Sequence, residues 1–304
     1  TVDKIEPLFW WAGMKNPELQ LMVYGENIAN YRPSISYEGV VMKSCVTLES
    51  PNYMLLYLDI SKAQPGTFDI VFQDGKKQFT YPYELKQRKD STDDIQGYDS
   101  SDVLYLVMPD RFANGDPSND QIEMGAEYQV DRSKFMARHG GDLKGISQKI
   151  DDGFFQDLGI TTIWISPITQ NPYDAWGQNV DPDTKFSGYH GYWPIFSTVV
   201  DKRFGTEEEL YTMLAEAHEG EMNVILDYVA NHLHIDSPVL KEHPDWTTEL
   251  MLPDGRKNIG MWDGETRLIT WFDEHIPTLD TRRNEVCEPM TDSALYWVRK
   301  FDFD

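Results

Sequence analysis

The sequence predicts two folds in succession, an all-β sandwich of immunoglobulin-like type over residues 1–90 and an α/β domain over residues 91–304. Three observations lead to this prediction. Residues 5–84 form short β-rich runs with no helical pattern between them. Residues 86–101 are polar and charged, as expected of an inter-domain linker. Beyond the linker, apolar strand runs alternate with helical stretches, which is the pattern of βα units.

The first domain consists of short runs that turn formers separate. The β-rich runs cover residues 19–24, 44–48, 54–60 and 67–72. Gly, Pro, Asn and Asp gather between them and mark the turns. Several short strands at regular spacing are typical of an antiparallel sandwich. We therefore expect a module here that takes no part in catalysis.

The second domain contains buried-strand runs and one strong helix. The strand runs cover residues 103–108, 161–166 and 224–229. The helix is predicted over 207–219, where Thr206 and Glu209 form a T-x-x-E capping box. Its apolar residues recur at helical spacing, and Gly220 is suited to end it. Helix and following strand make half of a βαβ unit.

A long loop-rich excursion follows the third strand of this domain. It covers about residues 233–283 and contains Trp246, Trp262 and Trp271. Loops of this length in a compact domain are usually functional or form a small domain of their own. We expect a small inserted domain here, followed by a second helix over 292–301.

The charge balance restricts the partners of the chain. Lys and Arg number 27 and Asp and Glu 51, which gives a formal net charge of −24. Such a chain repels nucleic acids and anionic membranes, whereas a neutral ligand or a cation binds more easily. No run approaches the roughly 18 apolar residues of a transmembrane helix. We therefore expect no nucleic-acid partner and no membrane insertion.

Cysteine usage and the first residue bear on the cellular location. Cys45 and Cys287 lie in different predicted domains, so we interpret them as separate thiols, with a single cross-link as the alternative. The chain begins with Thr1 rather than Met, which indicates that a leader was removed. We expect a periplasmic or secreted location, with a cytoplasmic one as the alternative.

The first candidate site follows the first strand of the α/β domain. Four oxygen-bearing side chains, those of Asn114, Asp116, Asn119 and Asp120, lie within seven residues made compact by Gly and Pro. A hard cation with 6 to 8 oxygen ligands requires such a cluster. An EF-hand is excluded, because Gln121 occupies the position that needs Gly. The alternative is an Asx-rich turn in solvent.

A second segment reads His139-Gly140-Gly141-Asp142. Paired glycines let backbone carbonyls approach a ligand closely, and Asp142 can add a carboxylate. An ordinary Gly-Gly turn is the alternative.

The third segment is Tyr189-His190-Gly191-Tyr192-Trp193. Three aromatic rings and a histidine around one glycine form a neutral surface with hydrogen-bond donors, which suits stacking against a sugar. Packing in the core is the alternative. The adjoining Ser-Gly pair favours an exposed loop.

The fourth segment is the carboxyl end of the third strand, where Asp227, Asn231 and His232 follow an apolar run. In parallel α/β folds chemistry is found at this end of the strands. His232 and His234 also form an H-x-H pair, which could bind a transition metal in a hydrolase of amidohydrolase type. In such barrels that pair is expected on the first strand, whereas here it follows the third. Strand-end caps without function are the remaining alternative.

In this order the four segments resemble the α-amylase superfamily, glycoside hydrolase family 13. Residues 227–232 (D-Y-V-A-N-H) are similar to its first conserved region and residues 189–193 to the loop at the −1 sugar subsite. Residues 110–120 with 140–142 are similar to the calcium loop of the neopullulanase and cyclomaltodextrinase subgroup. That subgroup carries an N-terminal β-sandwich, and the likeness is greatest to the periplasmic neopullulanase-type enzymes of bacterial starch utilisation. The resemblance implies that residues 91–304 are the first half of a (β/α)₈ TIM barrel.

The resemblance also implies roles for single residues. Tyr192 would stack on the −1 glucose, His190 and His232 would hydrogen-bond its hydroxyls, and Asp227 would brace the site. The implied substrate-binding residues are His190, Tyr192, Trp193, Asp227 and His232. The implied ligands of Ca²⁺ are Asn114, Asp116, Asn119, Asp120, Asp142 and the carbonyl of Gly140.

Two departures from the family pattern affect function. Residues 276–280 read I-P-T-L-D where the subgroup usually has M-P-K-L-N. The family's catalytic Arg, nucleophilic Asp, acid Glu and third Asp would all follow Asp304. We therefore assign no catalytic residue and expect the 304-residue chain by itself to be inactive.

The predicted function is retaining hydrolysis of α-glucosidic bonds in starch-derived glucans, namely pullulan, cyclodextrins and maltooligosaccharides. The expected partner is an α-glucan, and a homodimer is a further expectation. The alternatives are a non-catalytic carbohydrate-binding member of the same fold and the amidohydrolase-type barrel.

Overall fold

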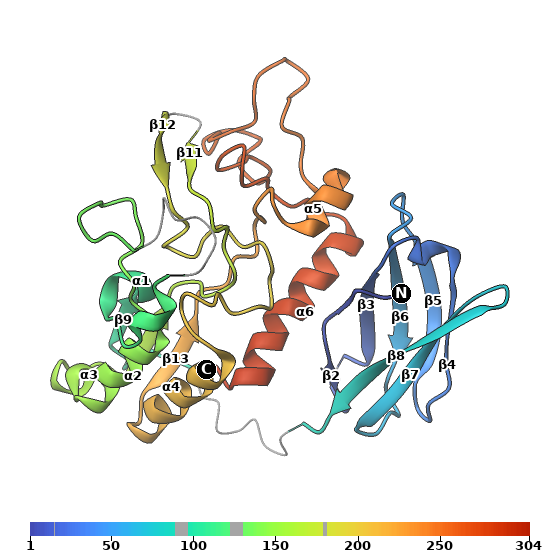
Figure 1. Cartoon of the computed structure of the whole chain (residues 1–304), viewed down its shortest axis with the longest axis horizontal. Coiled ribbons are helices and arrows are strands. Elements are labelled where there is room, and N and C mark those ends of the chain that lie inside the picture. Colours follow the sequence, from blue (N-terminus) through green and yellow to red (C-terminus); the bar gives the residue numbers. More distant parts are fainter. Residues whose placement is uncertain (15, 89–96, 122–129, 179–180) are drawn as a thin grey trace. The chain divides into compact units, whose positions relative to one another are not determined.

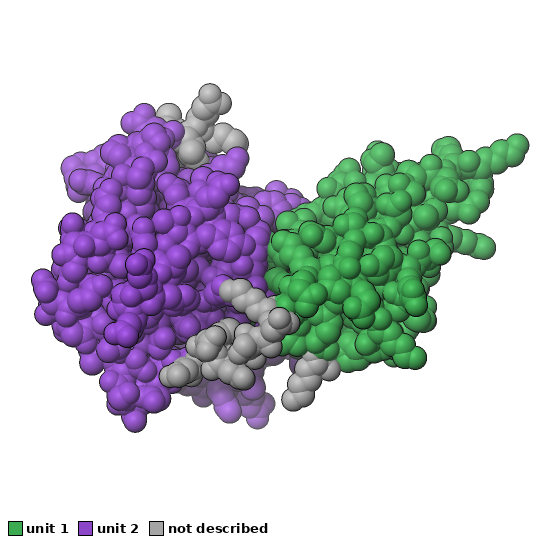
Figure 2. All heavy atoms as spheres, turned by 90° about the horizontal axis from the view of Figure 1, so that it is seen from below, with its two compact units in different colours: residues 1–94, 284–296 green, residues 95–283, 297–304 purple. Residues whose placement is uncertain are grey.

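The computed structural model describes residues 1–14, 16–88, 97–121, 130–178 and 181–304. The predicted domain boundary near residue 90 lies outside these ranges. The chain divides into two compact units (Figure 2). Unit 1 contains Thr1–Asp94 and Asn284–Tyr296, and unit 2 contains Ile95–Arg283 and Trp297–Asp304.

Unit 1 is built on two four-stranded sheets (Figure 1). The order of the first is β1 (Lys4–Glu6), β3 (Glu18–Tyr24), β6 (Tyr53–Asp59) and β5 (Val41–Thr47). The order of the second is β2 (Trp10–Trp11), β8 (Lys77–Lys86), β7 (Gly66–Asp74) and β4 (Arg32–Ile35). Neighbouring strands are antiparallel except β2 and β8, and the short helix η1 (Ile28–Asn30) adjoins β4. The predicted all-β sandwich is confirmed.

The core of unit 1 consists of the side chains on the inner face of each strand, which alternate with exposed ones. In β7, Phe68, Ile70 and Phe72 are buried and the residues between them are more exposed, because successive side chains of a strand point to opposite faces. Each buried side chain of this size stabilises the fold by about 1.5–3 kcal/mol. They pack with Leu21 and Leu56 of the facing sheet.

Strand β5 lies at the edge of the first sheet and contains a bulge. Met42 pairs with Leu58 and Ser44 with Tyr57, so Lys43 is the extra residue. Such an extra residue bends an edge strand and interrupts its hydrogen bonding. Lys43 forms an exposed ion pair with Glu18 at 2.9 Å.

Unit 2 is organised around a parallel sheet of three strands, in the order β13, β10 and β9. The strands are β9 (Leu104–Val107), β10 (Thr162–Ile165) and β13 (Asn223–Leu226). Thr162 pairs with both Leu104 and Asn223, so the three strands are in register. Their carboxyl ends therefore lie at the same edge of the sheet. β9 and β10 lie within the predicted strand runs, whereas β13 starts one residue before its predicted run of 224–229 and ends at Leu226.

Helices connect these strands, as expected of βα units. They are α1 (Pro109–Phe112), α2 (Leu143–Asp151), α3 (Phe154–Asp157) and α4 (Glu207–Glu219), with η2 (Pro117–Asn119). The predicted capping box of α4 is formed. Thr206 Oγ1 accepts the Glu209 backbone N–H at 3.2 Å, and Glu209 Oε2 accepts that of Thr206 at 2.8 Å.

Two irregular segments lie above the carboxyl edge of the sheet in Figure 1. One is the hairpin of β11 (Trp176–Gln178) and β12 (Asp181–Phe186). The other is residues 233–283, which hold only the short helices α5 (Pro238–Glu242) and η4 (Pro244–Trp246) besides isolated bridges. These loops form the excursion that the sequence indicated.

The last helix, α6, covers Asn284–Phe301 and starts earlier than the predicted residue 292. Pro289 lies inside it and cannot donate a backbone hydrogen bond, which is why the sequence pattern favours a later start. Ser293 Oγ donates to the Pro289 carbonyl at 2.8 Å in the following turn. Among the described residues, no helix is long and apolar enough to cross a membrane.

Candidate functional site

The candidate sugar-binding surface lies where β13 and the segment after β12 meet. Tyr192 Oη donates to Asp227 Oδ2 at 2.7 Å, joining an exposed ring to the carboxylate that follows β13. The rings of His190 and Tyr192 are stacked, with centroids 5.7 Å apart. We call Tyr192, Asp227, His190 and His232 the sugar wall.

Two histidines stand behind the exposed ring of Tyr192, and both are neutral at pH 7. Burial, with the nearby Arg138 cation, lowers the pKa of His190 to about 4. Burial also lowers the pKa of His232. Since His190 Nδ1 accepts the Tyr192 backbone N–H at 2.9 Å, its proton is on Nε2, where it can be donated to a hydroxyl.

The structure gives His232 a different setting from the one implied by the resemblance. Its Nε2 donates to the Tyr192 carbonyl at 2.8 Å, and its Nδ1 lies 3.2 Å from Asn231 Nδ2. Both ring nitrogens therefore have protein partners, and His232 holds the Tyr192 backbone in place. Direct bonding of His232 to sugar stays a prediction.

Trp193 is also set apart from the wall. It is buried and its ring packs edge-on against His190 and His275 at 4.8 and 4.6 Å. It supports the wall from behind. Its contact with sugar stays a prediction as well.

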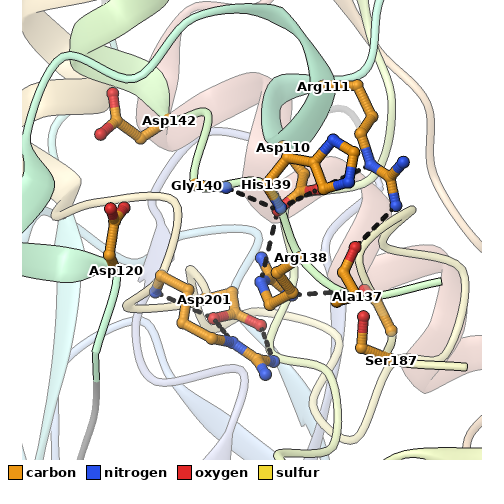
Figure 3. A network of polar contacts seen from close by, with 12 residues as sticks. Asp110, Arg111, Asp120, Ala137, Arg138, His139, Gly140, Asp142, Ser187 and Asp201 are labelled. Atoms are coloured by element: carbon orange, nitrogen blue, oxygen red, sulfur yellow. Dashed lines mark hydrogen bonds and ion pairs between the residues drawn. The ribbon is translucent and has the colours of Figure 1, made fainter. Parts of the chain in front are cut away.

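Figure 3 shows a buried ionic network around Asp110, Arg138 and Asp201. Asp110, almost fully buried, accepts the His139 backbone N–H at 2.9 Å and the Arg111 Nε–H at 2.8 Å, and pairs with Arg138 at 3.6 Å. Burial, with repulsion from Arg203, lowers the pKa of Arg138 to about 10, so it remains charged at pH 7. No sequence pattern predicted the burial of Arg138 in this network, since charged residues are seldom buried.

The candidate cation loop is held by one carboxylate. Asp142, fully buried, accepts N–H groups from Gly115 at 2.9 Å, Asp116 at 2.9 Å and Gly145 at 2.7 Å, and caps α2. It also accepts a hydrogen bond from Asn119 Nδ2 at 3.1 Å. These bonds fold residues 114–120 into a compact loop.

Oxygen atoms of this loop lack partners. Asn114 Nδ2 donates to both oxygens of Asp120, at 2.7 and 2.9 Å. The Oδ1 atoms of Asn114 and Asn119 are buried and accept no hydrogen bond within the described part of the chain. A Cβ added to Gly140 would lie 2.5 Å from Asp120 Oδ1, so only glycine fits there. Carboxylate and amide oxygens around a tight glycine fit a hard cation such as Ca²⁺.

Asp116 is placed differently from the other predicted ligands. Its Oδ1 accepts the Ser118 hydroxyl at 2.6 Å, and its Oδ2 lies 3.8 Å from Lys144 Nζ. Burial raises the pKa of Asp120, and the neighbouring Asp142 adds to this shift. Negative charge is thus crowded at Asp120, where a cation would relieve it.

The H-x-H pair does not form a metal centre in this structure. His232 faces the Tyr192 carbonyl, whereas His234 is fully buried and its ring lies 4.6 Å from that of Trp176. Across the described ranges, no group of three or more His, Cys, Asp or Glu residues is arranged to hold a metal ion.

Comparison with known proteins assigns the chain to a family. Residues 4–89 match the N-terminal domain of cyclomaltodextrinase, and residues 106–304 match the catalytic domain of alpha amylase. The chain belongs to the alpha-amylase family. This confirms the resemblance and the fold class, and excludes the amidohydrolase alternative.

Individual relatives agree with this family. Cyclomaltodextrin glucanotransferase from Bacillus sp. (strain 6.6.3) is 32% identical over 167 residues, 55% of this chain and 22% of the relative. The enzyme of that name from Paenibacillus macerans is 31% identical over 173 residues, with the same coverage. The chain therefore spans about a fifth of the length of these relatives.

Solved structures show the same fold. An Anoxybacillus alpha-amylase superposes with a TM-score of 0.54 and 33% identity, covering 67% of this chain and 39% of that one. The alpha-amylase of Geobacillus thermoleovorans, solved with acarbose, gives a TM-score of 0.51 and 32% identity, covering 67% and 38%. The three parallel strands of unit 2 are thus the first strands of an alpha-amylase barrel.

Proposed function

We propose that the protein is a glycoside hydrolase that cleaves α-glucosidic bonds in starch-derived glucans with retention of configuration. The observation that carries this proposal is the bond from Tyr192 to Asp227, which fixes an exposed ring at the carboxyl edge of the sheet. Pullulan, cyclodextrins and maltooligosaccharides are the proposed substrates, and the neopullulanase subgroup is the proposed subgroup.

The sugar wall binds and orients in this proposal. The Tyr192 ring stacks on the apolar face of a glucose, while Asp227 keeps the ring from rotating. The neutral His190 donates its Nε2–H to a sugar hydroxyl. A net charge of −24 opposes anionic ligands and leaves a neutral glucan favoured.

Bond cleavage requires a nucleophilic carboxylate and a protonated one beside the anomeric carbon. We assign neither role to a residue of this sequence. In this proposal, the residues described above bind the glucan and orient it.

We further propose that Ca²⁺ binds the loop of residues 114–120. Asn114, Asn119, Asp120 and Asp142 with the Gly140 carbonyl would hold it, supported by the unpartnered amide oxygens of Asn114 and Asn119. Bound there, the cation would neutralise Asp120 and fix the segment that Asp110 ties to the ionic network. It takes no part in bond cleavage in this proposal.

The function is tested by incubating the full-length protein with maltohexaose and following the anomeric protons by NMR. Retaining hydrolysis releases the α-anomer first. Initial release of the β-anomer would contradict the mechanism. Saturable binding of maltohexaose without products would favour the second candidate, a carbohydrate-binding member of the fold that the sugar wall alone also supports.

A further inference from the structure

Side chains, rather than a neighbouring strand, hold the backbone on both sides of Tyr192. This residue lies in a turn between β12 and α4. Its N–H donates to His190 Nδ1 at 2.9 Å, and its carbonyl accepts from His232 Nε2 at 2.8 Å. These bonds use one polar group of each peptide unit that adjoins Tyr192. The other polar group is the Gly191 carbonyl in the first unit and the Trp193 N–H in the second.

Both of these remaining groups bond to one side chain, the carboxamide of Asn171. Its Nδ2 donates to the Gly191 carbonyl at 3.0 Å, and its Oδ1 accepts the Trp193 N–H at 2.8 Å. Nδ2 also donates to the Thr169 carbonyl at 2.8 Å. Asn171 is fully buried. Because two carbonyls face Nδ2 and an N–H faces Oδ1, the amide has a single orientation that satisfies all three bonds.

A buried ion pair fixes the main chain of Asn171 in turn. Asp201 Oδ2 accepts the Asn171 N–H at 3.0 Å, and Arg203 Nη2 donates to the Asn171 carbonyl at 3.0 Å. The same Arg203 nitrogen bonds to Asp201 Oδ2 at 2.6 Å, and both side chains are buried. Gln170 Nε2 adds a bond to the Asn171 carbonyl at 2.8 Å. The main chain of Asn171 therefore cannot shift without breaking buried polar bonds, which is costly.

Gly191 lets the Tyr192 segment approach Asn171 closely. Its φ of +84° lies in the left-handed region that favours glycine, and a Cβ there would clash with the Pro167 carbonyl oxygen. The Gly191 N–H donates to the Gly188 carbonyl at 3.1 Å, which closes the turn. The backbone is thus shaped for the bonds that the carboxamide makes.

This anchoring matters because packing alone does not fix the Tyr192 ring. The side chain is 36% exposed, and its Oη is held by the bond to Asp227 at 2.7 Å. A rotation of either adjoining peptide unit would move the ring away from Asp227 and tilt its stacking face. Small misplacements of a group that orients the substrate are costly for the rate, even when their cause lies outside the site.

We propose that Asn171 is a positioning residue, whose carboxamide sets the orientation of the Tyr192 ring against the glucan. Asn171 is fully buried, so it acts through the backbone of Tyr192 and not by touching sugar. The ion pair of Asp201 with Arg203 holds Asn171 in the place where it can do this. The inference rests on the proposed function for its substrate class.

A double-mutant cycle in the full-length protein tests the proposal. Asn171→Leu keeps the branched shape of the side chain and removes its polar atoms, and Asn171→Ala is a second variant that leaves room for water at the freed groups. Each is made in the wild type and in Tyr192→Ala. With Tyr192 present, kcat/KM for maltohexaose should fall about 5-fold, and in Tyr192→Ala by less than about 2-fold, because residues that act together are not additive.

Asn258→Ala is the matched control. Asn258 is also a fully buried asparagine, and its Nδ2 donates to the Glu249 and Ile269 carbonyls at 3.0 and 2.9 Å. Its loss should lower the Tm as Asn171→Ala does, since both leave buried polar groups unpaired. Any effect on kcat/KM should be the same with and without the Tyr192 ring. Destabilisation alone therefore does not produce the coupling expected of Asn171.

The outcomes separate this inference from the proposed function. If folded Asn171 variants lower kcat/KM equally in both backgrounds, or leave it unchanged, Asn171 serves stability alone and the function stands. If the wild type binds maltohexaose without cleaving it, the same cycle is measured on the Kd by calorimetry. If it neither cleaves nor binds, the proposed function fails, and crystal structures of the wild type and Asn171→Ala decide. Loss of the bond between Tyr192 and Asp227 in the variant supports positioning, and an unmoved ring overturns it.

Discussion

The cation loop and the sugar wall differ in whether their polar side chains have hydrogen-bond partners within the protein. In the wall nearly every polar atom has a protein partner, so Tyr192 bonds to Asp227 and both nitrogens of His232 are occupied. In the loop, Asn114 and Asn119 bury oxygen atoms that none of the described residues satisfies. The polar atoms of the wall are thus mostly satisfied within the protein, whereas those two oxygens of the loop are not. Loss of an internal hydrogen bond should therefore lower the activity when the bond lies in the wall, and the stability when it lies in the loop.

The largest effect is expected from Asp142→Ala. It leaves several buried N–H donors without an acceptor and removes the cap of α2, which should cost about 3 kcal/mol or more. Thermal unfolding of the full-length protein measures this. Asp116→Ala is the matched control, because its half-buried carboxylate bonds locally to Ser118, and it should lower the Tm much less. Equal losses would contradict the clamp role of Asp142.

Removal of the cation should have the next largest effect. A cation that binds only the folded state stabilises it by about 2.7 kcal/mol at a concentration 100 times its Kd. EGTA should thus lower the Tm, and Ca²⁺ should restore it. An unchanged Tm, or zinc instead of calcium in elemental analysis, would show that the loop's free oxygens serve no calcium ion.

In the wall, Tyr192→Ala should lower kcat/KM for maltooligosaccharides about 10-fold or more, while the Tm changes little. The loss corresponds to roughly 1–3 kcal/mol of aromatic contact. Tyr192→Phe, which keeps the ring and loses only the bond to Asp227, should lose less. An unchanged kcat/KM in folded Tyr192→Ala would place this ring outside the substrate site.

The last prediction concerns pH. The folded protein holds the pKa of His190 at about 4, below its ordinary value of 6.5, so the unfolded chain binds more protons between these values. Stability should therefore fall as the pH is lowered from 6.5 to 4. His190→Gln should flatten this part of the Tm against pH curve, without abolishing it, because burial lowers the pKa of His234 and His275 too. An identical curve for wild type and variant would refute the assignment to His190.

Local patterns were predictable from the sequence, and long-range polar contacts were not. The capping box at Thr206 depends on residues three positions apart, so its sequence signature was sufficient. The Tyr192 bond to Asp227 joins residues 35 positions apart, and only the fold decides it. The resemblance placed His232 near the sugar, yet in the structure both of its ring nitrogens have partners within the protein. The ion pair of Asp110 with Arg138 had no signal in the sequence, because it joins two segments that share no motif.

From the bulge at Lys43 we infer how the first sheet avoids pairing with other chains. Strand β5 is exposed along its length, with Val41 60% and Val46 41% accessible, and it ends its sheet. A flat apolar edge of this kind recruits strands of other chains and starts aggregation. The extra residue twists the edge out of register, and its ammonium group would have to lose water to enter a new sheet. We therefore expect Lys43 to protect this edge strand against intermolecular pairing.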